Sequence, residues 1–164
     1  MDVLALFVTV VGLSAWMGAT IFMSFFVAPV ISRRLSPGQA ADISDILQPR
    51  LYWVSAASAI LMGIGGITAL FYPTLQTPTI TFLVLTGAAV ALSLYGGFVL
   101  VPRTTSLRDR LQSSAGSEWN FDVRERYDQA TRIAVFLNLL VLLLLLGAAA
   151  ALAAILSNPP PKAG

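Results

Sequence analysis

Two polar side chains stand inside the long apolar stretches of this sequence, and they are the first candidates for chemistry. Asn138 carries the only amide of these stretches, and Trp16 carries the only indole near the middle of one. An amide or an indole N–H in an apolar medium needs a hydrogen-bond partner. We expect Asn138 to bond to another helix of the same bundle rather than to a ligand, and Trp16 to pack in the core.

Metal and catalytic chemistry has little support in the sequence. The chain has no Cys and no His, which excludes disulfides, thiolate zinc sites and histidine-bound cofactors. Thioethers suit Cu(I), but Met17, Met23 and Met62 are scattered, and such methionines are more often apolar filling. No Ser-His-Asp set, carboxylate pair or phosphate-binding glycine loop is present. We therefore expect no catalytic residue, no metal, no cofactor and no enzyme.

The distribution of charge predicts the elements that hold these side chains. The chain is 57% hydrophobic and 11% charged, whereas soluble domains carry about 25% charged residues. Every basic residue except Lys162 falls within residues 33–50 or 103–132, and residues 51–102 carry no charge. A helix needs about 20 apolar residues to cross a bilayer. The pattern predicts an all-α polytopic membrane protein, a single domain of four transmembrane helices in a bundle at residues 3–32, 51–72, 79–102 and 133–157.

The arginines also predict an orientation. Connections rich in Lys and Arg face the cytoplasm, so residues 33–50 and 103–132 are predicted to be cytoplasmic. The uncharged turn at residues 72–78 and both termini are then outside, an N-out and C-out arrangement. We expect a bacterial inner membrane, or an intracytoplasmic membrane derived from it.

Helix signals stand in both cytoplasmic segments. Ser36 followed by Pro37 is typical of a helix start, and it predicts a short interfacial helix that Pro49 ends. Asn120 is expected to cap a helix that runs through Arg132 into the last span.

Small residues recur four apart along the spans, among them Gly18, Gly63 and Gly97. This spacing lets membrane helices approach one another closely. Packing within the bundle is the favoured interpretation, and a seam for a second copy or a partner is the alternative. The chain reads Phe-Val-Ala-Pro up to Pro29 and Phe-Val-Leu-Val-Pro up to Pro102. This similarity indicates either a weak internal repeat of two hairpins or the common gathering of proline at cytoplasmic helix ends.

Several short motifs together resemble the transmembrane-protein-205-like family. They are Ala15-Trp16-Met17-Gly18, the phenylalanines up to Ala28-Pro29, Pro49-Arg50-Leu51-Tyr52, Val101-Pro102 and Asn138. The resemblance implies four spans and no settled biochemical role. It also shows one departure, because Thr131 and Ala134 stand where that family commonly has a His and a Ser before the Asn.

These observations favour a non-enzymatic integral membrane protein, an accessory or structural subunit that packs against a larger membrane protein complex. The absence of catalytic groups, intramembrane charges and redox ligands motivates this hypothesis, together with the featureless leucine run at residues 139–146. The expected partners are the lipid bilayer and other membrane subunits or a second copy, and not nucleic acid. The candidates for structural or interaction roles are Trp16, Gly18, Pro29, Pro49, Arg50, Tyr52, Gly63, Gly97, Pro102 and Asn138.

The alternative hypothesis is a small transporter or exporter of an apolar or soft-metal substrate. It predicts a cavity in the membrane, near Trp16, the three span methionines and Asn138.

Overall fold

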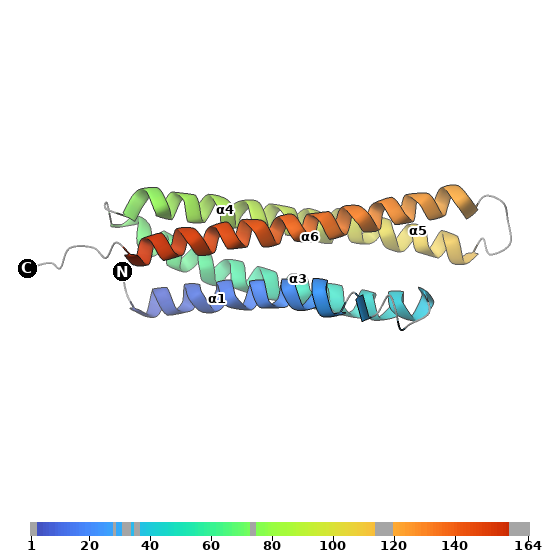
Figure 1. The fold of residues 1–164 in the computed structure, drawn as a ribbon, viewed down its shortest axis with the longest axis horizontal. Helices are drawn as coiled ribbons and strands as arrows, with labels where there is room; N and C mark the ends of the chain where they lie inside the picture. Colours follow the sequence, from blue (N-terminus) through green and yellow to red (C-terminus); the bar gives the residue numbers. More distant parts are fainter. Residues whose placement is uncertain are drawn as a thin grey trace, which may run out of the picture.

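The chain folds as helices that run alongside one another (Figure 1). The computed structural model describes residues 3–27, 29–30, 34, 37–72, 75–113 and 120–157. These residues are helical apart from the turn before α4, and they contain no strand. In chain order the elements are α1 (Val3–Ile21), the π-helix η1 (Phe22–Val27), α3 (Pro37–Leu70), α4 (Gln76–Tyr95), the π-helix η3 (Gly96–Leu100), α5 (Val101–Ser113) and α6 (Asn120–Ser157).

Four of the described helical segments are long and apolar enough to cross a membrane. They are Val3–Val27, Ile46–Leu70, Gln76–Leu107 and Arg132–Ser157. Each exceeds the roughly 20 residues that a bilayer requires. The predicted fold class, an all-α membrane protein with four spanning helices, is confirmed.

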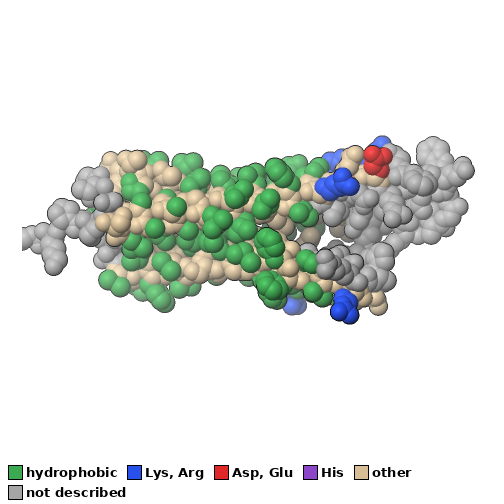
Figure 2. All heavy atoms as spheres, viewed as in Figure 1, with side chains coloured by type: hydrophobic (Ala, Val, Ile, Leu, Met, Phe, Trp, Pro, Cys, Tyr) green, Lys and Arg blue, Asp and Glu red, His purple; other side chains and the backbone are tan. Residues whose placement is uncertain are grey.

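The spans form two hairpins that pack side by side. Helix α1 packs mainly on α3, and α4 packs mainly on α6, with α3 and α4 also in contact. The turn between α3 and α4 lies at the same end as Val3 and Ser157, and the connection from α5 to α6 lies at the opposite end (Figure 1). On the face shown in Figure 2, arginine and acidic side chains gather at that opposite end, and hydrophobic side chains cover the middle. Both charged segments therefore belong to one end, as the sequence predicted.

Pro49 does not end a helix, so the predicted separation of an interfacial helix from the second span is wrong. Helix α3 begins at Pro37 and continues for 34 residues to Leu70; Ser36, the predicted cap, lies outside the described residues. An interior proline removes one backbone hydrogen bond and crowds the carbonyl four residues earlier. Membrane helices tolerate this loss when neighbouring groups compensate, and one missing bond does not divide a helix of this length.

Both π-helices precede a proline by the same interval. The π-helix η1 ends at Val27, two residues before Pro29, and η3 ends at Leu100, two residues before Pro102. A π-helix shifts the hydrogen-bond register by one residue, which removes the regular bond that a proline cannot make. Helix α5 consequently continues past Pro102 to Ser113, although the third span was expected to end there. The shared geometry supports the internal repeat of two hairpins.

The last helix begins near where the sequence placed it. Helix α6 runs without interruption for 38 residues from Asn120 through Arg132 to Ser157. At about 1.5 Å per residue it is much longer than a bilayer is thick. Its first turns therefore project beyond the membrane, beside α5.

A tightly packed core joins the two hairpins. Trp16, Met62, Phe82 and Leu145 are at most 1% exposed and belong to one cluster. The buried hydroxyls of Thr79 and Thr86 have no partner among the described residues. Several other hydroxyl groups in the spans bond to their own helices: Thr9 donates to the Ala5 carbonyl over 2.8 Å and Ser55 to the Leu51 carbonyl over 2.9 Å. These bonds satisfy polar groups that lipid cannot solvate.

Glycines set the close approach of α1 to α3. A Cβ on Gly12 would lie 2.9 Å from both the Leu61 Cβ and the Ser58 carbonyl oxygen, and a Cβ on Gly65 would overlap the Thr9 side chain. By contrast, a Cβ on Gly63 meets no heavy atom of the described residues within 4 Å. The crossing thus depends on Gly12 and Gly65 and not on Gly63.

The first prediction compares two glycines of α3 that lie two residues apart. Gly65→Ala forces the added methyl group into Thr9, and overpacking of this kind costs about 1–3 kcal/mol. Gly63→Ala adds a methyl group in open space and gains up to about 1 kcal/mol of helix propensity. The midpoint of thermal unfolding in detergent, followed by circular dichroism, is expected to fall clearly for Gly65→Ala only. Equal midpoints for the two variants would contradict this account of the crossing.

The second prediction concerns orientation, which single cysteines can test because the chain has none of its own. Gln76 and Glu125 are exposed and lie at opposite ends of the molecule. In intact cells, a membrane-impermeant maleimide is expected to label Gln76→Cys, and to label Glu125→Cys only after lysis. The reverse pattern would show that the arginine-rich end faces outward.

Candidate functional site

The amide of the spans belongs to the end that carries the arginines. Asn138 lies there, near the beginning of the α6 span, and its side chain is exposed. It precedes Leu145 by seven positions, so both lie on almost the same face of the helix. Leu145 is completely buried. The face of α6 that the bundle covers at Leu145 is therefore uncovered at Asn138.

The first hairpin shows the same loss of cover. Trp16 and Thr20 of α1 are buried, but no residue of the following π-helix, Phe22–Val27, is buried. The first hairpin is thus less covered toward the arginine-rich end, whereas Gly96, Leu100 and Ala130 of the second hairpin are buried there. Asn138 does not lie between helices of the bundle, and the expected hydrogen bond to another span is not found among the described residues.

Tyr52 connects the two hairpins at this level. A Cβ on Gly97 would lie 3.2 Å from two carbons of the Tyr52 ring, and one on Gly96 would lie 3.2 Å from its hydroxyl oxygen. The ring therefore lies against the backbone of η3, where only residues without a side chain leave room. Gly97, singled out in the sequence by its spacing, packs within the bundle through this contact.

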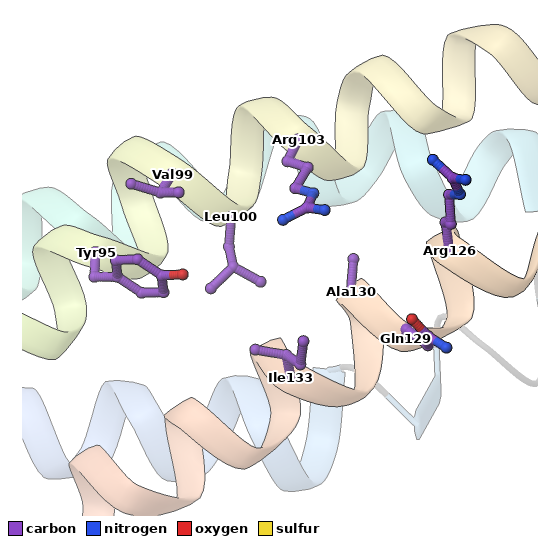
Figure 3. A pocket seen from close by; sticks show the side chains of 8 residues that line it. All are labelled: Tyr95, Val99, Leu100, Arg103, Arg126, Gln129, Ala130 and Ile133. Atoms are coloured by element: carbon purple, nitrogen blue, oxygen red, sulfur yellow. The ribbon is translucent and has the colours of Figure 1, made fainter. Parts of the chain in front are cut away.

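A small crevice opens between η3 and α5 on one side and α6 on the other (Figure 3). Its volume is about 80 Å³, and the residues around it are Tyr95, Val99, Leu100 and Arg103 from one side and Arg126, Gln129, Ala130 and Ile133 from the other. The guanidinium groups of Arg103 and Arg126 both lie in the space between the two helices (Figure 3). The described residues that form the crevice include two cations, Arg103 and Arg126.

The other candidate residues are spread over the molecule. Trp16 is buried in the core as expected, whereas Gly18 is exposed and a Cβ there meets no heavy atom of the described residues within 4 Å. Arg50 and Pro102 are exposed, Pro29 is half-buried after η1, and Pro49 lies inside α3. These positions are not brought together into one site.

The methionines do not form a group either. Met62 is completely buried in the core cluster, and Met17 packs against that cluster. Met23 lies in η1. Among the described residues no three His, Cys, Asp or Glu side chains are grouped as metal ligands.

Sequence reasoning overlooked the crevice, because its residues come from two separate helices whose packing the sequence does not show. Arg103 and Arg126 were both assigned to one cytoplasmic segment, which correctly placed them at the same end. Their pairing depends on α5 continuing past Pro102 and packing against the first turns of α6. A helical reading of residues 101–113 would have provided that signal.

The fold and the polarity of its ends define an all-α integral membrane protein with four spans. The model of a domain of unknown function, DUF4149, matches residues 11–113, and the chain belongs to this family. The matched residues end with α5 and leave out α6, hence Asn138 and Arg126. Neither a curated protein nor a solved structure matches the chain. The resemblance to the transmembrane-protein-205-like family stays a prediction.

The third prediction tests the contact between Tyr52 and η3. Gly97→Ala is expected to lower the thermal midpoint in detergent because the methyl group presses on the Tyr52 ring, which lies 3.2 Å from the Cβ position. The same change is expected to cost less in a Tyr52→Ala background, since the ring is absent, and a double-mutant cycle measures the difference. Gly87→Ala is the control, because a Cβ on Gly87 meets no heavy atom of the described residues within 4 Å. Strict additivity of the Gly97 and Tyr52 changes would rule out the contact.

Proposed function

We propose that this protein is a non-enzymatic accessory subunit that packs against another membrane protein through the face of α6 that carries Asn138. The single observation that carries the proposal is the exposed amide on a side of α6 that is buried further along, at Leu142 and Leu145. The four apolar spans place that amide in or near lipid.

An uncovered amide is costly at this depth. Leaving an amide without a partner in an apolar medium costs about 1–3 kcal/mol by mutational measures. Polar side chains within spans accordingly mark contacts with other groups, and hydrogen bonds between membrane helices contribute about 1 kcal/mol each. A helix of a partner protein that covers this face could donate to or accept from Asn138.

The surroundings of Asn138 suit a helix rather than a small polar ligand. Val135, one turn before it, is 64% exposed, and Leu142, one turn after it, is 9% exposed. Cover on this side of α6 is thus greater one turn after Asn138 than at Val135. An apolar strip with one amide is the surface that an inserted apolar helix with a single polar group would match.

The core gives the transporter hypothesis less support. Trp16 and Met62 are 1% and 0% exposed, so side chains fill the place where that hypothesis needs a cavity. The accessory role is therefore the one we propose.

The fourth prediction concerns co-purification from native membranes in a mild detergent. The tagged wild-type chain is expected to bring a second membrane protein with it, and Asn138→Leu is expected to reduce the recovery of that protein severalfold. Phe136→Leu is the matched control, because Phe136 is exposed at the same depth but lies 200° around the helix. Mass spectrometry of the eluate provides the measurement.

Three results would contradict the proposal. They are a wild-type chain recovered alone as a monomer, a partner retained undiminished by Asn138→Leu, and a partner lost equally with Phe136→Leu. Recovery of a second copy only would point to a homo-oligomer in place of an accessory role.

A further inference from the structure

The crevice between α5 and α6 has the composition of an anion site. Arg103 projects from α5 and Arg126 from α6, and both guanidinium groups lie between the helices, as Figure 3 shows. Gln129 of α6 is also among the lining residues. Guanidinium groups bind phosphate oxygens through pairs of parallel N–H hydrogen bonds. Two arginines from facing helices therefore suit a phosphate, which has several oxygens, better than a monatomic anion such as chloride.

The size of the crevice limits its occupant. Its volume is about 80 Å³, whereas sites for drug-sized molecules span about 300–1,000 Å³. A phosphate group fits such a space, and a whole nucleotide or a comparable metabolite does not. The rest of a larger ligand must therefore lie outside the crevice.

The crevice lies at the boundary between the apolar spans and the charged end. Arg103 is near the end of the span Gln76–Leu107, and Arg126 precedes the span Arg132–Ser157 by less than two helical turns. Lipid headgroups occupy this level of a bilayer. Basic pockets between membrane helices at such a level are typical binding sites for phosphorylated headgroups.

Apolar side chains continue the crevice toward the middle of the membrane. Val99 and Ile133 are 46% and 51% exposed, and Tyr95, one turn before Val99, is 49% exposed with an apolar ring. Helix α4 with η3 supplies one side of this strip and α6 supplies the other. An acyl chain attached to a phosphate in the crevice would lie along it.

We propose that the crevice binds the phosphate group of an anionic membrane lipid, with Arg103 and Arg126 holding the phosphate and the Val99–Ile133 strip holding an acyl chain. Free inorganic phosphate has the same phosphate chemistry as the headgroup but carries no acyl chain that could contact the Val99–Ile133 strip. The proposal is independent of the accessory role, since the crevice is formed by Arg103 and Arg126 and not by Asn138.

The test measures lipid retention by the purified chain in detergent micelles. Native mass spectrometry is used to titrate phosphatidylglycerol, with diacylglycerol, which lacks the phosphate, as the comparison lipid. We expect one saturable phosphatidylglycerol site in the wild type and none for diacylglycerol. Arg103→Gln and Arg126→Gln are each expected to weaken the site at least about tenfold, because each removes a charge-assisted pair. Arg103→Lys keeps the charge but loses the planar guanidinium group, and its affinity for phosphatidylglycerol is expected to lie between those of the wild type and Arg103→Gln.

Arg132→Gln is the matched control, because Arg132 is an exposed arginine of α6 outside the crevice. Each variant is first shown to keep the wild-type thermal midpoint. Unchanged affinity in Arg103→Gln would overturn the proposal. An equal loss of affinity in Arg132→Gln would also overturn it, because lipid binding would then reflect only a general attraction between arginines and anionic lipid. Calorimetry with inorganic phosphate alone forms the second arm. Binding there with the same arginine dependence would overturn the assignment to a lipid.

Discussion

The helical architecture of this fold depends on the inability of lipid to hydrogen-bond to a polar group. Backbone groups in the spans must be paired within helices, and charged side chains must stay at the ends. The spans are long helices, and hydroxyls such as those of Thr9 and Ser55 donate to backbone carbonyls of the same helix. The arginines gather at one end of the molecule (Figure 2). The same constraint means that the exposed amide of Asn138 calls for an explanation, as do the buried hydroxyls of Thr79 and Thr86, which have no partner among the described residues.

Sequence reasoning succeeded where this constraint acts on composition. The uncharged residues 51–102 and the arginine groups beside them were sufficient to predict four helices and one charged end. The predicted helix boundaries were wrong where tertiary packing overrides the local preference of proline to end a helix. Pro49 and Pro102 are breakers in water, yet α3 continues through the first, and the π-helix η3 leads α5 past the second. The residue spacing drew attention to Gly63, but it is Gly65 that lies against Thr9 of α1. Which glycine of α3 contacts α1 depends on how the two helices cross, and spacing alone does not show this.

The position of Asn138 was equally beyond prediction. The leucine run after it has no polar face, so nothing in the sequence fixes which side of α6 meets the bundle. Only the burial of Leu145, on the same face, shows that Asn138 lies on a side that is covered further along the helix. The crevice was overlooked for a related reason, since Arg103 and Arg126 line one crevice only when α5 and α6 pack side by side.

The arginine-rich end has two distinct surfaces: an apolar face with one amide, which suits a protein helix, and a basic crevice, which suits a phosphate. The first carries the central claim. Its most direct test places the photo-crosslinking residue benzoylphenylalanine at Val135, one turn from Asn138, in cells. The account predicts a crosslink from Val135 to another membrane protein and none from Phe136, on the far side of the helix. Crosslinks to no protein from Val135, or equal crosslinks from both positions, would contradict it.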